Sequence, residues 1–290
     1  MSHTAAKVCV NGEIVPAGAA RVSAFDAAFL HGVGLFETLR AYGGAIFARD
    51  AHLERMRNSA EALKLHLAID ADLCREALQR TLDANGLKDA RLRLTVTPGV
   101  TQLPNGATEP GQPTILATAT ALAAYPREYY EKGMTVLLSR FRQGPADPLA
   151  GHKTTSYWPR LAALREAQEK HCGEALWFTP ENLLAEGSIS NVFIVRDDEI
   201  RTPPVGTPVL PGIVRAFVLE TATKAGRAVR EMPLTVNDLL DADEVFLTNS
   251  IMEIMPVCRI ERKPIGTEKP GPVTAWVADR YREAVHDVPR

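Results

Sequence analysis

The sequence has few of the residues on which metal centres and disulfide frameworks are built. Only four of the 290 residues are cysteine, and they stand singly, with no Cys-x-x-Cys pair. The seven histidines form no short cluster with them, so no group has the spacing of a zinc site and we predict no metal. Scattered cysteines are typical of reducing compartments, and we therefore expect a cytoplasmic protein.

An excess of charge of one sign is lacking as well. The chain has 33 Lys and Arg against 35 Asp and Glu, a net charge of −2. A nearly neutral chain offers no broad basic surface, so we expect neither nucleic acid nor a membrane as a partner but a small molecule. The first thirty residues include Lys7, Glu13, Arg21 and Asp26 and no long apolar run, from which we expect neither a signal peptide nor a spanning helix.

Familiar motifs of other enzyme classes are also missing. Gly32-Val33-Gly34 lacks the third glycine and the following helix of a dinucleotide-binding fingerprint. No Gly-x-x-x-x-Gly-Lys-Ser/Thr loop and no Gly-x-Ser-x-Gly elbow occurs. These absences argue against nicotinamide and nucleoside triphosphate chemistry.

Polarity patterns in residues 1–122 predict an N-terminal α/β domain. Alternation around Asn11-Gly12 predicts a hairpin, and a second strand pair flanks Gly43-Gly44. Apolar residues at spacings of three and four predict one helix capped by Asp50 and another over 71–85. The remaining expected elements are strands 91–97 and 114–120, joined by a Pro- and Gly-rich loop, 98–113, that is long enough to cover a site.

The strand pattern ends near Ala123, and Pro126 interrupts the chain before a new strand begins at Met134. We therefore expect an interdomain linker at 123–131 and a C-terminal domain at 132–290. Its expected elements are strands 134–139, 175–179, 183–185, 191–195, 229–231 and 244–247, and helices near 159–170, 213–225, 236–240 and 273–284. The fold class is thus α/β, of the α+β kind, in two domains.

Three segments of the second domain hold residues suited to chemistry. Lys153 stands where a Gly-rich loop leads into a helix, and a buried lysine there would have a lowered pKa, although it could be a surface residue. Glu186 ends an apolar strand and precedes glycine and small hydroxyl residues, which a hairpin would also explain. Pro211-Gly212 begin a helix whose N-terminal N–H groups could bind a phosphate, although most helix starts bind nothing.

Taken together, seven segments in fixed order resemble the fold-type IV pyridoxal-phosphate enzymes. This family includes the branched-chain and D-amino acid aminotransferases and the aminodeoxychorismate lyases. Each segment is a weak signal, but all seven occur in order over nearly the whole chain. They are Asn11-Gly12-Glu13, Phe29 to Arg40, His52-Leu53-Glu54-Arg55-Met56, Lys153, Glu186 to Asn191, Leu210 to Arg215 and Asp243 to Pro256.

The resemblance implies a small N-terminal α/β domain, a larger C-terminal pseudo-barrel domain and pyridoxal 5′-phosphate in a cleft between them. Lys153 resembles the catalytic lysine that binds this cofactor and moves a proton. Glu186 resembles the carboxylate that pairs with the pyridine nitrogen, and Tyr157 takes the place of a tyrosine near the cofactor hydroxyl. Members of the family are dimers, so the resemblance also implies a homodimer.

A phosphate site is implied in the same way. Arg55 matches the phosphate-binding arginine of the family, Ile213 and Val214 would supply backbone N–H groups, and Ser250 would add a hydroxyl. Further cofactor contacts implied by position are Ser188, Ser190 and Asn191.

The substrate site is matched less closely. Period two puts Arg91 and Arg93 on one face of a strand, which suggests carboxylate recognition, and Arg93 takes the place of an arginine of the branched-chain enzymes. Arg91 could equally be a surface residue. His31 replaces a tyrosine common in those enzymes, and Phe36 could line an apolar pocket. The substrate contacts implied by position are His31, Phe36, Arg91, Arg93 and Ile251.

We therefore predict an aminotransferase that moves an amino group between an amino acid, preferably a branched-chain-like L-amino acid, and a 2-oxo acid in a ping-pong reaction. Pro148 to Gly151 and Phe36-Glu37-Thr38 favour an aminodeoxychorismate lyase instead, whereas Lys153 to Tyr157 lacks the Leu-Asn-Arg type sequence that follows the lysine of lyases. A D-amino acid aminotransferase is a second alternative, although its arginine and histidine after strand 91–97 are absent. A non-catalytic scaffold is disfavoured because every chemical position is retained.

Overall fold

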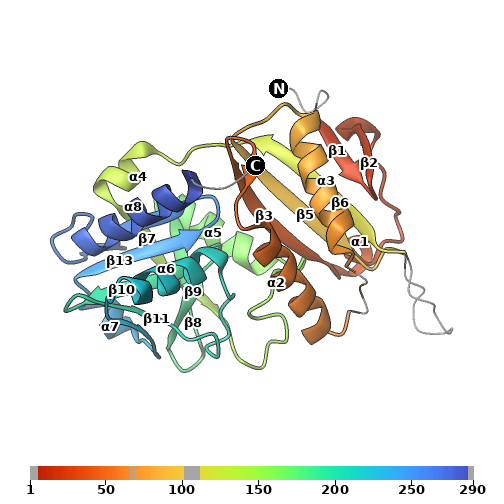
Figure 1. The fold of residues 1–290 in the computed structure, drawn as a ribbon. Helices are drawn as coiled ribbons and strands as arrows, with labels where there is room; N and C mark the ends of the chain where they lie inside the picture. The colour runs from red at the N-terminus through yellow and green to blue at the C-terminus, as the bar shows by residue number, and fades with distance from the viewer. Residues whose placement is uncertain (1–5, 66, 68, 101–111, 287–290) are drawn as a thin grey trace. The chain divides into compact units, whose positions relative to one another are not determined.

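The computed structural model describes residues 6–65, 67, 69–100 and 112–286 (Figure 1). Most of the loop 98–113 therefore lies outside the described residues. The chain forms two compact units. Unit 1 contains the chain up to Ala123, the segment His152–Ser156 and the end of the chain from Val285; unit 2 contains Ala124–Gly151 and Tyr157–Ala284. The segment around Lys153 thus groups with unit 1, whereas we expected 132–290 to form one domain.

Unit 1 is an antiparallel sheet with two helices on one face (Figure 1). Its strand order is β2-β1-β6-β5-β3-β4. The strands are β1 (Lys7–Val10), β2 (Glu13–Pro16), β3 (Leu35–Tyr42), β4 (Ala45–Ile46), β5 (Ala90–Thr97) and β6 (Thr114–Ala121), and the helices are a 3-10 turn (Ala17–Ala19), α1 (Ala27–His31), α2 (Arg49–Ala62) and α3 (Ala71–Ala84).

Alternation along the strands decides which face of this sheet is covered. On β5, Leu92, Leu94 and Val96 are buried in a core that α2 and α3 complete, while Arg91 and Arg93 lie on the opposite face. The predicted hairpin turn at Asn11-Gly12 is confirmed, because both residues have positive φ, 49° and 86°.

The start of α2 differs from the expectation. The residue before the helix is Ala48, which has a φ of 49° and caps nothing with its side chain. Asp50 lies within the first turn, where its carboxylate pairs with Arg75 at 2.6 Å. The prediction that Asp50 caps the helix was therefore wrong; an acidic residue in the first turn still interacts favourably with the helix dipole.

Unit 2 is a mixed sheet with the strand path β12-β11-β10-β13-β14-β7-β8-β9 and with β15 beside β14. Its strands are β7 (Met134–Arg142), β8 (Glu174–Phe178), β9 (Leu184–Gly187), β10 (Asn191–Arg196), β11 (Glu199–Thr202), β12 (Val229–Glu231), β13 (Glu244–Asn249), β14 (Glu253–Ile260) and β15 (Lys263–Pro264). Its helices are α4 (Arg127–Lys132), α5 (Trp158–Glu169), α6 (Ile213–Lys224), α7 (Val236–Leu240) and α8 (Pro272–His286), of which the last two residues group with unit 1. Helix α4 occupies the second half of the segment 123–131 that we expected to be a linker and ends one residue beyond it.

The sheet of unit 2 curls back on itself. Strands β9 and β10 are separated only by residues 188–190, yet β9 ends the strand path and β10 lies near its other end. A three-residue connection can join them only if the sheet bends until β9 returns to β10, which gives a barrel-like shape. Glu186 on β9 and Asn191 on β10 are thereby brought close together, where the two ends of the sheet meet.

None of the helices in the described part of the chain has the length and hydropathy needed to cross a membrane.

We predict that Asp26→Ala lowers the free energy of unfolding by about 2–4 kcal/mol. Asp26 is fully buried, caps α1 by accepting from the Ala28 N–H, and accepts hydroxyl donors from Thr97 and Thr114 at 2.8 and 2.7 Å. Its removal leaves two hydroxyls without their acceptor. Urea denaturation measures the loss. Asp70→Ala, at the exposed cap of α3, should cost only about 1 kcal/mol; equal losses would contradict this account.

Candidate functional site

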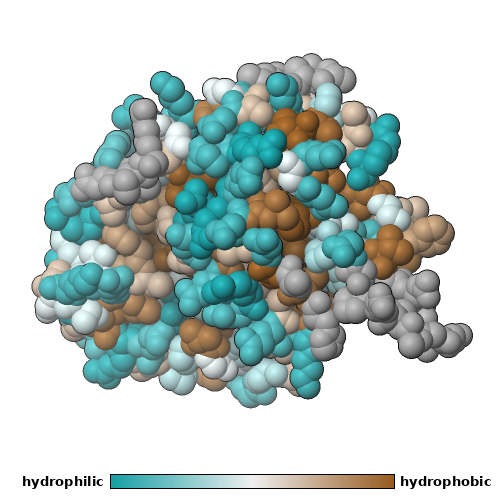
Figure 2. All heavy atoms as spheres, turned by 45° about the vertical axis from the view of Figure 1, so that its right-hand side comes forward, coloured by the Kyte–Doolittle hydropathy of each residue, from teal (hydrophilic) through white to brown (hydrophobic). Residues whose placement is uncertain are grey.

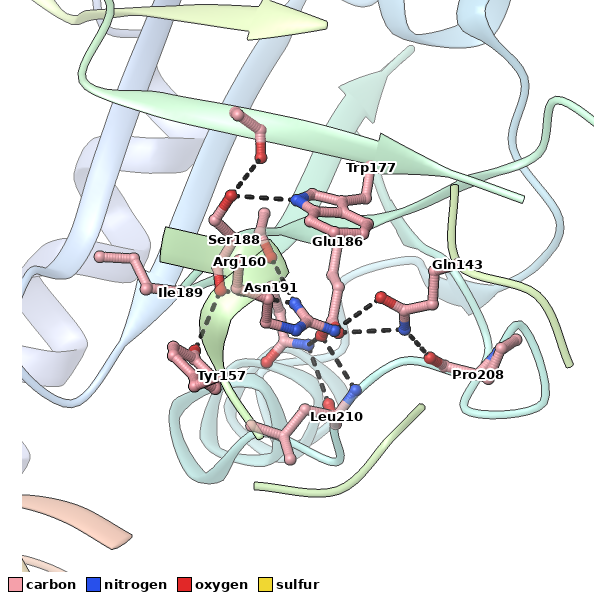
Figure 3. Close-up of polar contacts among 12 residues, drawn as sticks. Gln143, Tyr157, Arg160, Trp177, Glu186, Ser188, Ile189, Asn191, Pro208 and Leu210 are labelled. Atoms are coloured by element: carbon pink, nitrogen blue, oxygen red, sulfur yellow. Dashed lines mark hydrogen bonds and ion pairs between the residues drawn. The ribbon is translucent and has the colours of Figure 1, made fainter. Parts of the chain in front are cut away.

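Glu186 is the centre of a polar cluster in unit 2 (Figure 3). It is 2% exposed and lies on β9 among apolar residues. Its Oε1 accepts from Arg160 Nη2 at 2.6 Å and from Gln143 Nε2 at 3.2 Å. Its Oε2 accepts from the Leu210 N–H at 2.9 Å and from Asn191 Nδ2 at 3.3 Å. Four donors thus hold an ionised carboxylate in one orientation.

Arg160 is the counter-ion of this cluster, and sequence reasoning missed it. It lies on the first turn of α5, and its guanidinium also donates to Gln143 Oε1 at 2.6 Å and to the Gly187 carbonyl at 3.0 Å. Burial opposes the charge, but the adjacent Glu186 outweighs burial and raises the pKa of Arg160. Only the fold brings α5 against β9, so no sequence spacing could have shown this pair.

The two serines after Glu186 bond inside the protein. Ser188 Oγ accepts from the Trp177 indole N–H at 3.0 Å (Figure 3), and Ser190 Oγ donates to Glu174 at 2.9 Å. Glu174 is fully buried and also accepts from the backbone N–H groups of residues 175, 188 and 189. Burial raises the pKa of Glu174, and these bonds partly oppose the rise. Glu174 therefore fixes the β9–β10 turn; the predicted cofactor role of the serines stays a prediction.

The start of α6 suits an anion. Its first turn, which includes Ile213 and Val214, has no side-chain cap, so backbone N–H groups point out of the helix end. Gly212 precedes it, and a Cβ there would lie 1.9 Å from the Oδ1 of Asn191. Only glycine allows this close approach. Because Asn191 also contacts Glu186, the helix start and the carboxylate are held by one side chain.

The turn between β13 and β14 contains Ser250 and Ile251. Asn249 Oδ1 accepts from the N–H groups of Ile251 and Met252 at 2.8 and 2.7 Å, and its Nδ2 donates to the Ile189 carbonyl at 3.0 Å. The side chain of Asn249 thus ties this turn to the β9–β10 turn. Tyr157, at the start of α5, donates its hydroxyl to the Ser188 carbonyl at 3.0 Å and joins the same cluster (Figure 3).

Lys153 lies in unit 1, on a short segment that pairs with the beginning of β3. Its carbonyl accepts from the Phe36 N–H at 2.9 Å, and the Thr155 N–H donates to the Gly34 carbonyl at 2.9 Å. This pairing gives the lysine a rigid backbone although it stands outside a named strand. Its Nζ is 4.6 Å from the centroid of the Phe36 ring, so an amine is held at an apolar surface.

Arg93 reaches the same ring from β5. Its guanidinium carbon is 3.8 Å from the Phe36 centroid, and its Nε donates to Thr95 Oγ1 at 3.2 Å. The structure thus brings together three residues predicted for the site: Lys153, Phe36 and Arg93. Arg91 and His31 are exposed, the latter at the end of α1, and neither is placed in this group.

A second buried carboxylate, Glu37, lies on the core face of β3 and meets two residues of α2. Arg55 Nε donates to Glu37 Oε1 at 2.8 Å, Arg55 Nη2 lies 2.5 Å from Oε2, and His52 Nδ1 lies 2.7 Å from Oε2. Burial would raise the pKa of Glu37, but Arg55 and His52 outweigh it and lower that pKa to about 2. Burial lowers the pKa of His52, so the imidazole is neutral near pH 7 and donates from Nδ1. Arg55 is thereby fixed in place.

Each unit by itself has groups that suit one part of a pyridoxal phosphate. Unit 2 has a buried carboxylate for the pyridine nitrogen, and an uncapped helix start and the Ser250 hydroxyl for the phosphate; unit 1 has the Lys153 amine for the aldehyde. Sequence motifs named Lys153, Glu186, Arg55 and the helix start. The supporting residues Gln143, Arg160 and Glu174 were missed, since their roles come from tertiary contacts.

We predict that Glu37→Gln lowers the free energy of unfolding at pH 7 by about 3–5 kcal/mol, because it leaves the buried Arg55 without its counter-ion. The folded-state pKa of Glu37, about 2, is below its ordinary value of 4.5. The ion pair therefore stabilises fully above pH 4.5, and its contribution disappears as the pH falls toward 2.

Urea denaturation of both proteins between pH 7 and pH 3 would show this as a difference that is constant above pH 4.5 and narrows below it. Glu76→Gln, which removes an exposed partner of Arg80 on α3, should change stability by less than about 0.5 kcal/mol. A difference between wild type and Glu37→Gln that does not depend on pH would contradict the assignment.

Comparisons with known proteins identify the family of this chain. The family model for class IV amino-transferases matches residues 34–260. A protein of Methanocaldococcus jannaschii, provisionally assigned as a branched-chain-amino-acid aminotransferase, is 33% identical over 278 residues, 96% of each chain. The aminodeoxychorismate lyase of Bacillus subtilis is 30% identical and covers 97% of this chain and 95% of its own. The D-alanine aminotransferase of Bacillus licheniformis is 29% identical, covering 96% and 97%.

Solved structures match equally well over the whole chain. The branched-chain amino acid aminotransferase of Escherichia coli superposes with a TM-score of 0.90 at 26% identity, covering 96% of this chain and 94% of that one. Another branched-chain aminotransferase, solved with pyridoxamine 5′-phosphate, superposes with a TM-score of 0.89 at 30% identity, covering 97% and 94%. The predicted family and fold class are thereby confirmed. Since both the family model and these relatives span most of its length, the protein belongs to the class IV aminotransferases, a family of pyridoxal-phosphate enzymes.

Proposed function

We propose that this enzyme transfers an amino group between a branched-chain-like L-amino acid and a 2-oxo acid in a ping-pong reaction, with pyridoxal 5′-phosphate bound to Lys153. The observation that carries the proposal is the shared contact of Lys153 and Arg93 with Phe36, at 4.6 and 3.8 Å. An amine, a cation that can bind a carboxylate, and an apolar ring are the three partners that an apolar amino acid needs.

Each group has a defined task in this proposal. The cofactor supplies an electron sink for the carbanion that forms when the Cα proton leaves. Lys153 accepts and returns the Cα proton, and Phe36 packs against the substrate side chain. Glu186 keeps the pyridine nitrogen protonated because its own charge is fixed by four donors. The N–H groups of Ile213 and Val214, the Ser250 hydroxyl and Arg55 bind the phosphate.

The branched-chain preference is supported by the apolar Phe36 and by the names of the M. jannaschii and E. coli proteins. One observation favours a second candidate, aminodeoxychorismate lyase, because the B. subtilis lyase matches nearly the whole chain at 30% identity. The two reactions share the lysine and the cofactor, so the fate of the bound amino group distinguishes them: a transaminase keeps it on the cofactor.

We also propose that the enzyme is a homodimer. Apolar side chains are exposed on and around α1: Val22, Phe25, Phe29, Leu30 and Val100, with Phe29 76% exposed. Val100 belongs with them because it forms a β-bridge with Asp26. Figure 2, which turns the right-hand side of Figure 1 forward, shows hydrophobic surface on this side. A patch of this kind, which we call the α1 patch, suits a second copy of the chain.

We also propose that the protein is cytoplasmic. Its four cysteines are buried free thiols, and free thiols are typical of proteins in a reducing compartment.

The function is tested with the purified holoenzyme. We expect L-leucine to bleach the bound cofactor's visible absorbance and a 2-oxo acid to restore it, with kcat/KM at least about tenfold higher for L-leucine than for D-alanine. Lys153→Ala should lower turnover by about 10²–10⁴-fold or more. Borohydride reduction followed by peptide mapping should place the cofactor on Lys153, and Lys132→Ala, which changes an exposed lysine of α4, should leave turnover intact.

Two results would contradict this function. Consumption of aminodeoxychorismate with release of 4-aminobenzoate, without bleaching by any amino acid, would establish the lyase. A label on another lysine would remove Lys153 from its role.

For the dimer, we expect sedimentation of the wild type at twice the chain mass of 31.6 kDa and dissociation of Phe29→Asp, because burial of a phenylalanine contributes about 1.5–3 kcal/mol per copy. Val205→Asp changes another exposed apolar residue, one that lies in unit 2, and should leave the dimer intact. Identical masses for wild type and Phe29→Asp would rule out the α1 patch as the interface.

A further inference from the structure

The segment that carries Lys153 is short. Only residues 152–156 group with unit 1 here, and the neighbouring residues Gly151 and Tyr157 group with unit 2. Five residues cannot form a core of their own. Contacts with other elements of unit 1 must therefore fix the position of Lys153.

Backbone and hydroxyl bonds join this segment to β3 and to the chain just before it. The Lys153 carbonyl accepts from the Phe36 N–H at 2.9 Å, and the Thr155 N–H donates to the Gly34 carbonyl at 2.9 Å. The Thr155 hydroxyl also donates to the Gly32 carbonyl at 2.6 Å. All three bonds lie at Lys153 or after it in the sequence, so they leave the residue before the lysine to another contact.

His152 makes that contact, with helix α2. Its Nδ1 lies 3.0 Å from the Oγ of Ser59. Ser59 is 5% exposed, and a buried hydroxyl needs a hydrogen-bond partner. Burial lowers the pKa of His152, so its imidazole is neutral near pH 7 and adds no positive charge next to Lys153.

Ser59 lies one turn after Arg55, on the same face of α2, because residues four apart in a helix lie one above the other. Arg55 is held by Glu37 of β3 at 2.8 Å. Phe36, the residue before Glu37, is the one that donates to the Lys153 carbonyl. The contacts therefore close a ring, which runs through β3, Glu37, Arg55, Ser59, His152, Lys153 and back to β3.

Electrostatics place the amine of Lys153 near the same helix. Burial lowers the pKa of His52, and the charges of Arg55 and Lys153 lower it further, against the opposite effect of Glu37. Coulomb interactions weaken with distance. The lysine charge is therefore close enough to the polar residues of α2 to affect them.

We propose that the bond between His152 and Ser59 is a positioning contact of the reaction, which holds Lys153 and Arg55 at a fixed separation. This inference rests on the proposed function, in which Lys153 binds the cofactor and moves the Cα proton while Arg55 binds the phosphate. Both residues must meet one small molecule, so a change in their separation weakens binding and misplaces the amine. A misplacement of about 1 Å lowers a rate on the order of a hundredfold. The role of His152 is thus exerted through Lys153.

The test compares variants of the two partners as purified holoenzymes. His152→Ala should lower kcat by about tenfold or more and change KM by less than about threefold, because the amine is misplaced while the substrate contacts remain. Ser59→Ala should cause the same loss, and the double variant should lose no more than either single one, since all three lack the same bond. His286→Ala, the same change at the exposed end of α8, should have no effect.

The identity of the bonded atom gives a sharper comparison. An asparagine amide lies close to the position of the histidine Nδ1, whereas a glutamine amide reaches the position of Nε2. His152→Asn should therefore keep kcat within about threefold of wild type, because an amide both donates and accepts. His152→Gln should be impaired as His152→Ala is.

Two readouts do not depend on turnover: the loss of cofactor during dialysis, and the fraction of Lys153 labelled after borohydride reduction. In His152→Ala and Ser59→Ala, cofactor affinity should fall by about tenfold, and the labelled fraction should fall with it. Urea denaturation reports separately on the fold of each variant.

A lower unfolding stability with unchanged cofactor affinity and kcat would overturn the proposal, because the contact would then only support the fold. Additive losses in the double variant, or an asparagine variant as impaired as alanine, would overturn it as well. A wild type that transfers no amino group, with variants that still lose the cofactor more easily, would contradict the proposed function and leave the positioning role standing. A label on another lysine of the wild type would overturn both.

Discussion

The carboxylate of Glu186 is the constraint on which the arrangement of unit 2 depends. An isolated charge at 2% exposure would cost far more than the fold can offset, so donors must surround it. They come from the end of β7, from α5, from β10 and from the chain before α6. Those segments are far apart in sequence, and satisfying one side chain fixes their positions relative to one another. The start of α6 follows, because Asn191 donates to both Glu186 and the Leu210 carbonyl, which lies just before Gly212.

Unit 1 also contains a buried carboxylate that binds residues of another element. Glu37 occupies a position on β3 where alternation calls for an apolar residue, and α2 supplies Arg55 and His52 to it. A buried ion pair of this kind is seldom more stable than a well-packed apolar replacement. The Glu37–Arg55 pair is better explained by its effect on the orientation of Arg55. With two of its nitrogens on Glu37, the Arg55 guanidinium has one orientation, which is the property needed to bind a phosphate rather than merely attract it.

Sequence patterns predicted the strands and helices whose signals are local. The hairpin at Asn11-Gly12 and the helices over 71–85 and 213–225 follow from turn residues and from period. Three strands were missed: the two-residue β15, and β11 and β14, for which there are physical reasons. Strand β14 contains Pro256, which argues against a central strand, but at this residue β14 pairs only with Phe246 of β13, because its pairing with β7 begins at Val257. Strand β11 follows a turn at Asp197-Asp198 with φ values of 52° and 62°, which Asp tolerates without the usual glycine.

The candidate site divides in the same way between local and tertiary information. Motifs name residues such as Lys153 and Glu186, whose chemistry is carried by the side chain itself. They cannot name Arg160 or Glu174, which act only through contacts that the fold creates. Ser188 and Ser190 show the converse. Small hydroxyl residues after a carboxylate resemble ligand contacts, yet both bond to groups inside unit 2 and shape the β9–β10 turn. These hydrogen bonds give each serine a structural task beside the cofactor contact that the motif predicts. That task depends on Trp177 and Glu174, which the fold brings to the serines from another strand, so sequence alone could not show it.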